Sequence, residues 1–262
     1  MKICSTCGTW YGEEVPPICA ICSDDRQYIL ENGQQWTNLS DLQKTYSIRF
    51  SEVQPELMDM RITPSFAIGQ RALLVSSPSG NILWDCIPLI DEPSIAFIKS
   101  KGGLRGIAVS HPHFYSSISA YAKAFGCPVY LHAKDQEWIM DKGDHIQLWD
   151  GAQKSLWDGI EIINTGGHFP GSAVLHLPNH GKGGSLLTSD SIYVCRDRKQ
   201  VTCMHSYPNL IPLKKSSVEQ VHQSVSGLPF DSIYGGFDFM NLTGGANNIF
   251  ERSMRRYLQI FE

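Results

Sequence analysis

The chain has 262 residues, of which 42% are hydrophobic, and a formal net charge of −4. This length allows one large domain, or one domain with a small appendage, and the apolar share is sufficient for a substantial core. The acidic balance argues against a nucleic-acid partner, because such surfaces need clustered positive charge. No apolar run approaches a membrane span, and the start Met1-Lys2-Ile3-Cys4 lacks the apolar region of a signal peptide. We therefore expect a cytoplasmic protein with no membrane partner.

The first 22 residues contain two cysteine motifs, Cys4-x-x-Cys7 and Cys19-x-x-Cys22, separated by eleven residues. Each motif turns tightly enough to give two sulfurs to one ion, so the spacing predicts a closed thiolate site with a structural role. The segment is too short to build its own core, and a metal would replace that core. It resembles a zinc ribbon and, less closely, a rubredoxin. We expect zinc, with iron or two disulfides as the alternatives.

We place a domain boundary after residue 32, so that residues 1–32 form the ribbon and residues 33–262 the main domain. Beyond this boundary, strand patterns mix with helix patterns, as in an α/β protein. The predicted strands are 46–50, 81–85 and 127–132, with a hairpin or two short strands within 66–75, and the predicted helices are 116–125, 135–140, 215–226 and 247–261.

Three apolar runs that are typical of buried strands each end in residues of a metal-ligand type. His111-Pro112-His113 follows the first run, Gly166-Gly167-His168 the second, and Asp190 the third. In an extended segment, residues i and i+2 face the same side, so the first two imidazoles can address one ion. The glycines permit a tight turn close to that ion. Three imidazoles and a carboxylate form a zinc set if water shares the coordination sphere. The alternative is that these are core histidines with ordinary partners.

These motifs resemble the metallo-β-lactamase superfamily of hydrolases, over roughly residues 65–240. That family carries H-x-H-x-D-H, a later G-G-H, a bridging Asp and a final Gly-His-Gly. His111, His113, His168 and Asp190 match four of those positions, and Trp84-Asp85 resembles an early strand ending in a structural Asp. The resemblance implies an α/β fold in the form of a four-layer αββα sandwich, with the metal ligands at one edge.

The departures from the family pattern all fall on its second metal site. Tyr115-Ser116 stands where the family has Asp-His, and Gly235-Gly236-Phe237 stands where it has Gly-His-Gly. We therefore expect a mononuclear site. Tyr115 either donates a hydrogen bond to a developing oxyanion or only fills the vacated volume. The catalytic candidates are Asp190, Tyr115 and His205, and the candidate metal ligands are His111, His113, His168, Asp190, Cys4, Cys7, Cys19 and Cys22.

The resemblance implies a metal-dependent hydrolase that uses a mononuclear-zinc-bound hydroxide on a small ester, thioester, lactone or amide. One zinc is expected at the cysteine site and one at the His-Asp site, with iron as the alternative at either. The alternative function is a non-catalytic binding or sensor protein that has lost the second metal site. An iron enzyme acting on a thiol or persulfide is less favoured, because such family members keep the missing Asp. A nuclease is disfavoured by the acidic charge. The expected partner is a small-molecule substrate, and no pattern indicates an oligomeric state.

Overall fold

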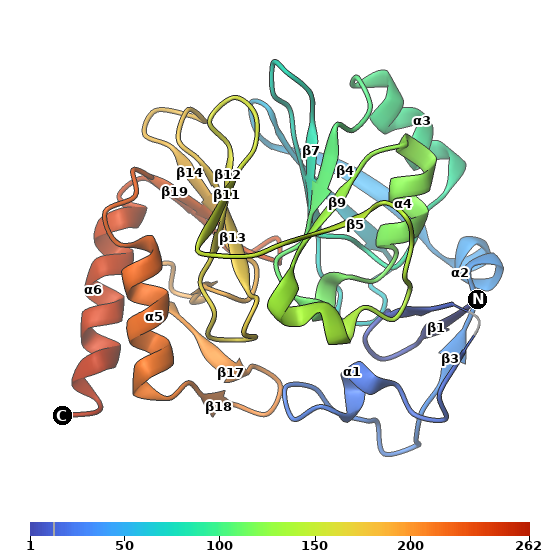
Figure 1. Ribbon diagram of the computed structural model, residues 1–262, viewed down its shortest axis with the longest axis horizontal. Coiled ribbons are helices and arrows are strands. Elements are labelled where there is room, and N and C mark those ends of the chain that lie inside the picture. The colour runs from blue at the N-terminus through green and yellow to red at the C-terminus, as the bar shows by residue number, and fades with distance from the viewer. Residues whose placement is uncertain (13) are drawn as a thin grey trace. The chain divides into compact units, whose positions relative to one another are not determined.

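The computed structural model describes residues 1–12 and 14–262 of the chain. This part of the chain divides into two compact units, whose elements are labelled in Figure 1. The first unit comprises Met1–Leu131 and Gln136–Leu148, and the second comprises His132–Asp135 and Trp149–Glu262. Each unit builds one large sheet and packs helices against it.

The first unit begins with a small antiparallel sheet in the strand order β2-β1-β3. Ile3 at its centre pairs with Trp10 on one side and with Thr37 on the other. We call residues 2–12 and 14–37 the ribbon. The division into domains at residue 32 stays a prediction. The ribbon elements are β1 Lys2–Cys4, β2 Trp10–Tyr11, α1 Ala20–Ser23 and β3 Trp36–Thr37.

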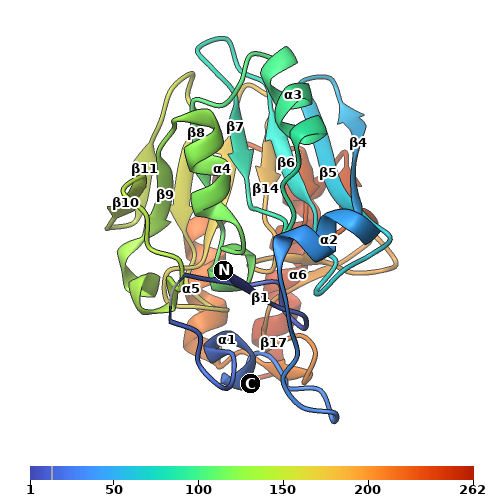
Figure 2. The ribbon, with the colours of Figure 1, turned by 90° about the vertical axis from the view of Figure 1, so that its right-hand side faces the viewer.

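A seven-stranded sheet forms the body of the first unit, in the order β10-β9-β8-β7-β6-β5-β4. β7, β8 and β9 run parallel, and the pairs from β4 to β7 are antiparallel. Parallel neighbours need a crossover, and the helices α3 and α4 provide the two crossovers here (Figure 2). The elements are α2 Leu39–Thr45, β4 Ser47–Gln54, β5 Leu57–Thr63, β6 Ala72–Val75, β7 Ile82–Trp84, α3 Glu92–Ser100, β8 Gly106–Ala108, the 3-10 helix η1 Pro112–Phe114, α4 Ile118–Phe125, β9 Val129–His132, the 3-10 helix η2 Ala133–Trp138 and β10 Ile146–Trp149.

Apolar side chains from the helices and from the sheet form the core of the first unit. Ile98 of α3 and Tyr121 of α4 belong to the same buried cluster as Leu74, Leu83 and Ile107 of the central strands. Burial of this apolar surface stabilises the unit by about 25 cal/mol for each Å² removed from water. The central strands are thereby held in register up to their carboxyl ends, where the candidate ligands follow.

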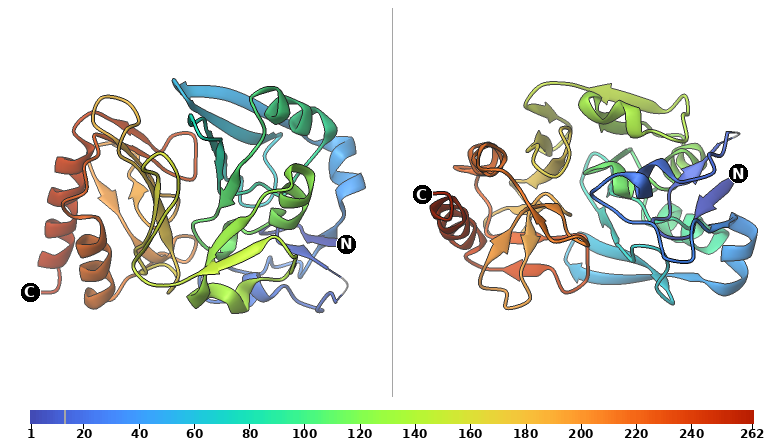
Figure 3. Two further views of the ribbon diagram at one scale, coloured as in Figure 1. Left: turned by 45° about the horizontal axis from the view of Figure 1, so that its top comes forward. Right: turned by 90° about the horizontal axis from the view of Figure 1, so that it is seen from below.

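The second unit contains a six-stranded sheet in the order β11-β12-β13-β14-β19-β20. Only β14 and β19 are parallel neighbours, with Leu186 beside Ile233. Helices α5 and α6 lie side by side along one face of this sheet (Figures 1 and 3). The elements are β11 Gln153–Ser155, β12 Glu161–Asn164, β13 Ala173–Leu177, β14 Ser185–Leu187, β15 Tyr193–Val194, β16 Val201–Thr202, β17 Met204–Ser206, β18 Ile211–Pro212, α5 Lys215–Val225, β19 Ser232–Tyr234, β20 Asn241–Thr243 and α6 Ala246–Gln259.

The apolar side chains along one face of α6 pack into the core of the second unit. Phe250 and Met254 of α6 and Val218 and Val221 of α5 form one buried cluster with Leu186 of the sheet. The predicted helix at 247–261 is therefore confirmed as an element that covers the core. Among the described residues, no helix combines the length and the apolar character that crossing a bilayer requires.

Three local predictions differ from the structure. The helix predicted at 135–140 is instead the 3-10 element η2, Ala133–Trp138, with non-helical dihedrals at Asp135. Residues 66–71 form turn and irregular chain rather than a strand, and only Ala72–Val75 of that run joins the sheet. The segment His111-Pro112-His113 is not extended throughout: His111 has extended dihedrals, but Pro112–Phe114 form a 3-10 turn. Proline at the first position of that turn fits its fixed φ, which is why the chain turns at once after His111.

Candidate functional site

The described chain carries two groups of candidate metal ligands, and all eight side chains are buried. One group is Cys4, Cys7, Cys19 and Cys22 of the ribbon. The other candidate ligands are the pair His111 and His113 in the first unit and the pair His168 and Asp190 in the second, and each pair is described within its own unit.

The four ribbon sulfurs lie within 4.8 Å of one another. The Sγ atoms of Cys4 and Cys22 are 3.6 Å apart, as are those of Cys7 and Cys19. A tetrahedral zinc ion with Zn–S bonds of about 2.3 Å would separate its sulfurs by roughly 3.8 Å. A disulfide needs sulfurs about 2.05 Å apart, and all four cysteines are free. The spacing therefore fits one closed thiolate site rather than two disulfides.

Neighbouring side chains hydrogen-bond to three of these sulfurs. Tyr11 Oη donates to Cys19 Sγ at 3.3 Å and Gln34 Nε2 to Cys4 Sγ at 3.2 Å, while Thr9 Oγ1 lies 3.1 Å from Cys7 Sγ. Hydrogen bonds from Cys19 lower the pKa of Cys4, and the hydrogen bond from Cys22 lowers the pKa of Cys19. Burial raises the pKa of Cys7, and the hydrogen bond with Cys19 raises the pKa of Cys22, so the four thiols do not share one direction of shift.

The ribbon packs closely on a segment of the first unit that leads towards the histidines. Trp10 Nε1 donates to Pro88 O at 3.2 Å. Gly8 has a φ of +79°, and a Cβ there would lie 2.6 Å from the Pro88 side chain. Only glycine satisfies both the positive φ and the close approach.

Residues 86–90, which we call the carbonyl segment, are buried without joining any strand or helix. A peptide carbonyl buried in this way needs a donor, and side chains supply all of them here. Besides Trp10, the donors are Gln70 and Ser116 to Cys86, Ser117 to Ile87, Tyr121 to Leu89, and Gln43 to Ile90, at 2.6–3.3 Å. Ser116 and Ser117 lie just after the 3-10 turn Pro112–Phe114, which we call the histidine turn. Their hydrogen bonds to the carbonyl segment therefore fix the carboxyl-terminal end of that turn.

The near end of the histidine turn is fixed by Asp85. This residue has a φ of +63°, and its Oδ1 accepts a hydrogen bond of 2.8 Å from Ser110 N. Ser110 Oγ in turn lies 2.8 Å from His111 Nδ1. With Nδ1 used in this way, Nε2 is the nitrogen of His111 that would coordinate a metal. The sequence predicted a structural Asp here but gave no sign of the serine contact.

His111 and His113 come together through the 3-10 turn. Their ring centroids are 5.1 Å apart at an angle of 72°, and one ring nitrogen of each lies within 4.8 Å of the other. The predicted proximity of the two imidazoles is therefore found, although the extended geometry that was its stated reason is wrong.

His168 follows two glycines with φ values of +60° and +83°. A Cβ on Gly166 would run into the Gln220 side chain, and one on Gly167 would lie 2.8 Å from Val221 of α5. His168 is buried, and its Nδ1 donates to Met204 O at 3.2 Å. Because a carbonyl only accepts, the proton sits on Nδ1 and the lone pair on Nε2. The predicted tight glycine turn is found.

Asp190 lies on a turn directly after β14. Ser191 N donates to Thr188 O at 3.0 Å across that turn, and Ser189 has a φ of +49°. Tyr207 Oη donates to the carbonyl oxygen of Asp190 at 2.8 Å, and the Tyr207 and His168 rings are 5.8 Å apart. A carboxylate oxygen of Asp190 and a ring nitrogen of His168 lie within 4.8 Å of each other. Burial raises the pKa of Tyr207 well above its usual range, so it remains a donor at neutral pH.

The other catalytic candidates lie in different surroundings. Tyr115 is buried and belongs to the apolar core cluster of the first unit, which fits the volume-filling interpretation. His205 lies half-buried in the short strand β17, next to Met204, whose carbonyl holds His168. Their catalytic roles stay predictions.

The chain positions that depart from the family's second metal site hold groups with other contacts. Ser116 Oγ donates to Cys86 O at 3.3 Å, as described above. Gly236 stands at the position of the last histidine, and Phe237 beside it stacks on Phe239, with ring centroids 5.9 Å apart and an angle of 14°. A hydroxyl already bonded to a carbonyl is a poor ligand for a divalent metal ion, and glycine has no side chain to offer one.

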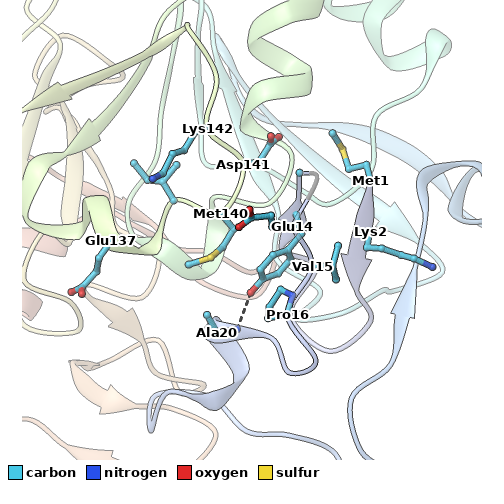
Figure 4. A pocket seen from close by; sticks show the side chains of 13 residues that line it. Met1, Lys2, Glu14, Val15, Pro16, Ala20, Glu137, Met140, Asp141 and Lys142 are labelled. Atoms are coloured by element: carbon cyan, nitrogen blue, oxygen red, sulfur yellow. Dashed lines mark hydrogen bonds between the residues drawn. The ribbon is translucent and has the colours of Figure 1, made fainter.

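A hollow of about 1520 Å³ lies in the first unit, between the ribbon and residues 137–142 (Figure 4). Tyr11, Val15 and Met140 contribute to its walls, and its described lining contains no cysteine and no histidine. Lys2, Glu14, Glu137, Asp141 and Lys142 give it charges of both signs. Among the described residues, its lining contains no group of ligands close enough to share a metal ion, and its charges do not select one sign of ligand charge.

No family model matches the chain. Among curated proteins, the uncharacterized protein YmaE of Bacillus subtilis (strain 168) is 40% identical over 262 aligned residues, which cover 98% of this chain and 95% of YmaE. Among solved structures, the DIM-1 metallo-β-lactamase matches with a TM-score of 0.59 and 14% identity, covering 80% of this chain and 98% of that one.

Two further solved structures match the fold of this chain with similar TM-scores. VMB-1 matches with a TM-score of 0.60 and 14% identity, over 83% of this chain and all of that one (100%). The mono-zinc form of the metallo-β-lactamase FIM-1 from Pseudomonas aeruginosa matches with a TM-score of 0.57 and 15% identity, over 80% and 96% of the two chains. The predicted fold class is confirmed: the chain belongs to the family of YmaE and has the metallo-β-lactamase fold.

Proposed function

We propose that the chain is a metal-dependent hydrolase of small esters, thioesters, lactones or amides. In this proposal His111 and His113 of the first unit and His168 and Asp190 of the second hold one metal ion, and the ribbon cysteines hold another. Zinc is the proposed ion at both places. Three imidazoles with one carboxylate, and four thiolates, are donor sets that zinc accepts.

The observation that carries the proposal is how the imidazoles are held within their own units. His168 Nδ1 donates to Met204 O, and His111 Nδ1 is bound to Ser110 Oγ. Metal-ligating histidines use their second nitrogen in this way, because the contact fixes the ring and the tautomer. In a histidine that only fills the core, no function requires Nδ1 rather than Nε2 to make the contact with the protein.

A metal ion bound there would activate a water molecule and polarise the substrate's carbonyl oxygen. The chain's own residues would position the ligands. Tyr207 holds the main chain of Asp190, Asp85 holds Ser110, and the carbonyl segment holds Ser116 and Ser117. Such supporting contacts typically change metal affinity or activity by about 10–100-fold when removed.

The proposed site is mononuclear, and two observations support this. The positions where the family keeps its second-site ligands hold Ser116, bonded to Cys86 O, and Gly236, which has no side chain. FIM-1, which shares the fold, has been crystallised in a mono-zinc form. The same two residues also favour the second candidate, a binding or sensor protein that keeps one metal without turnover.

The test compares His168→Gln with His222→Gln, a histidine of α5 that pairs with Glu251 instead. Zinc per chain would be measured by elemental mass spectrometry, and hydrolysis with 4-nitrophenyl acetate and a small thioester. We expect about two zinc ions in the wild type and in His222→Gln, and about one in His168→Gln, with turnover reduced at least about 100-fold.

Three other outcomes would separate the candidates. Two ions per chain without hydrolysis across ester, thioester, lactone and amide substrates would support the binding protein and reject the hydrolase. One ion in both the wild type and His168→Gln would show that only the ribbon holds metal. Three ions per chain would reject the mononuclear site.

A further inference from the structure

A row of aromatic side chains begins at the ligands of the second unit and runs away from them. Tyr207 lies 5.8 Å from His168, Tyr193 stacks on Tyr207 at 4.9 Å, and Phe239 lies 6.1 Å from Tyr193. Phe237 stacks on Phe239 at 5.9 Å. We call Tyr207, Tyr193, Phe239 and Phe237 the aromatic shelf. All distances are between ring centroids within the second unit.

We infer that the shelf binds a flat aromatic ring that carries an anionic group, and that this is the substrate class of the proposed hydrolase. The reaction named here rests on the proposed function. The binding of the ring rests on the shelf itself.

The first step of the argument is exposure. All four rings of the shelf are half-buried, whereas Phe230 and Phe250 of the same unit are buried in its core. Tyr193, Phe237 and Phe239 pack against the core cluster of the second unit, and each keeps part of its surface exposed. Partly exposed aromatic side chains are common components of ligand-binding surfaces.

The second step is position. Tyr207 Oη is bonded to the main chain of Asp190, so the inner end of the shelf is attached to a proposed metal ligand. Tyr193 is three residues beyond Asp190 in the sequence. Phe237 directly follows Gly236, which stands at the position of the family's last histidine. The outer rings of the shelf therefore belong to the segment that departs from the family's second metal site.

The third step is charge. The Cζ atom of Arg196 lies 3.5 Å above the centre of the Phe239 ring. The side chain is exposed, and no ion pair is recorded for it within the described residues. Its position places the guanidinium over Phe239, the third ring of the shelf. A planar guanidinium recognises carboxylate, sulfonate or phosphate groups through paired N–H donors.

The three features together select one ligand chemistry. An aliphatic chain would gain burial against the shelf, but not the offset or edge contacts that ring faces offer to another ring. A cationic ligand would meet the positive charge of Arg196. An aromatic ring with an anionic substituent uses both the ring faces and the guanidinium.

The experiment measures binding of three probes to the full-length protein by saturation-transfer NMR and titration calorimetry. The probes are benzenesulfonate, cyclohexanesulfonate and benzyl alcohol, and sulfonates are used because they are weak ligands for zinc. The first has a ring and a charge, the second only the charge, and the third only the ring. We expect benzenesulfonate to bind about three- to tenfold more tightly than either of the others.

Two shelf variants and two matched controls assign the site. Phe239→Leu should remove the preference for the aromatic ring, and Arg196→Gln should remove the preference for the charge. Phe261→Leu alters a ring at the end of the chain that stacks on Tyr257, and Arg255→Gln alters an exposed arginine of α6. Neither control should change the binding of any probe. Equal binding of the three probes, or loss of binding in the controls as much as in the shelf variants, would overturn the inference.

A kinetic arm separates this inference from the proposed function. The kcat/KM values of 4-sulfophenyl acetate and of ethyl acetate would be compared in the wild type and in both shelf variants. Binding of the probes without hydrolysis would reject the hydrolase and leave the shelf standing. Hydrolysis of both esters with no effect of Phe239→Leu or Arg196→Gln on their ratio would reject the shelf and leave the hydrolase.

Discussion

The two groups of candidate ligands differ in how much of the fold each needs. The ribbon cysteines come from one stretch of 22 residues, and one small sheet with one short helix places all four sulfurs. The histidines and Asp190 come from the ends of strands in two units and are held by contacts from other segments. The cysteine group thus depends on local structure, whereas the other candidate ligands depend on contacts between segments far apart in the sequence.

The residues that contact the two groups also differ in how far along the chain they lie from the ligands. The cysteines are contacted by side chains of the ribbon itself, namely Thr9, Tyr11 and Gln34. Four sulfurs complete a tetrahedron, so no coordination position remains for a substrate. His111 is contacted by Ser110, His168 by the carbonyl of Met204 and Asp190 by the hydroxyl of Tyr207. A set of three imidazoles and one carboxylate accepts water as a further ligand.

The largest expected effect comes from breaking the local site. Cys7→Ser combined with Cys19→Ser removes two of the four thiolates, and we expect the free energy of unfolding to fall by at least about 3 kcal/mol, because binding energy at such sites is folding energy. Denaturant unfolding followed by circular dichroism measures this. Cys195→Ser alters a half-buried cysteine outside the ribbon and should leave stability nearly unchanged. Equal losses in both variants would argue against a structural metal.

The next largest loss of stability is expected from substitution of Asp85, whose contacts support the histidine turn rather than the cysteine group. Asp85→Ala removes the acceptor for the buried Ser110 N–H and places alanine at a positive φ, so we expect a loss of about 2–3 kcal/mol. Zinc should also leave the His-Asp site more readily, as measured by competition with a chelator. Asp85→Asn keeps an acceptor oxygen and tolerates the left-handed region, so its loss should stay below about 1 kcal/mol. An alanine variant as stable as the asparagine variant would contradict this account.

Trp10 tests whether the two groups are coupled within the first unit. Trp10→Phe removes the hydrogen bond to Pro88 O while keeping an aromatic ring, and we expect a loss of about 1 kcal/mol. The ribbon should keep its zinc, and the chelator should extract zinc faster from the His-Asp site. Trp36→Phe keeps an aromatic ring against Tyr11 and serves as the control. Zinc release at the wild-type rate would show that the ribbon does not support the histidine turn.

The smallest expected effect is on the pH dependence of the free energy of unfolding and concerns His132 of the second unit. Burial lowers the pKa of His132 from its ordinary value of 6.5, and Lys134 lowers it further, while the hydrogen bond to Gly151 O and the charge of Asp150 oppose this. The unfolded chain therefore takes up a proton at this residue more readily than the folded chain. Its contribution to stability is complete above pH 6.5 and is lost as the pH falls from there towards the folded pKa.

The test for His132 is the slope of stability against pH. His132→Gln can still donate to Gly151 O but does not titrate, so its free energy of unfolding should fall less between pH 7.5 and about 5 than that of the wild type. Identical slopes in the two proteins would show that His132 is not the source.

The difference between the two groups also decides what the sequence could predict. The cysteine site followed from spacing alone, because its geometry is local. The strand-end positions of His111, His168 and Asp190 followed from apolar runs, and the glycines before His168 were interpreted correctly because positive φ and close packing are glycine properties.

What the sequence could not predict depends on contacts between distant residues. The serine beside His111 has no pattern of its own, and the carbonyl of Met204 carries no side-chain signal at all. The segment around Pro112 was predicted to be extended, although proline is equally suited to begin a 3-10 turn, which is what it does. The aromatic shelf combines residues 193, 207, 237 and 239, which only the folded chain brings together.

The carbonyl segment has a consequence for how the chain can vary. Its contacts use the main chain of residues 86–90, so substitutions of its apolar side chains need only preserve volume and leave every hydrogen bond in place. The donors are different, because Ser117, Tyr121 and Trp10 each contribute a specific polar atom. In a survey of all single substitutions, the buried apolar segment should therefore be permissive, and the polar residues surrounding it should be the restricted positions.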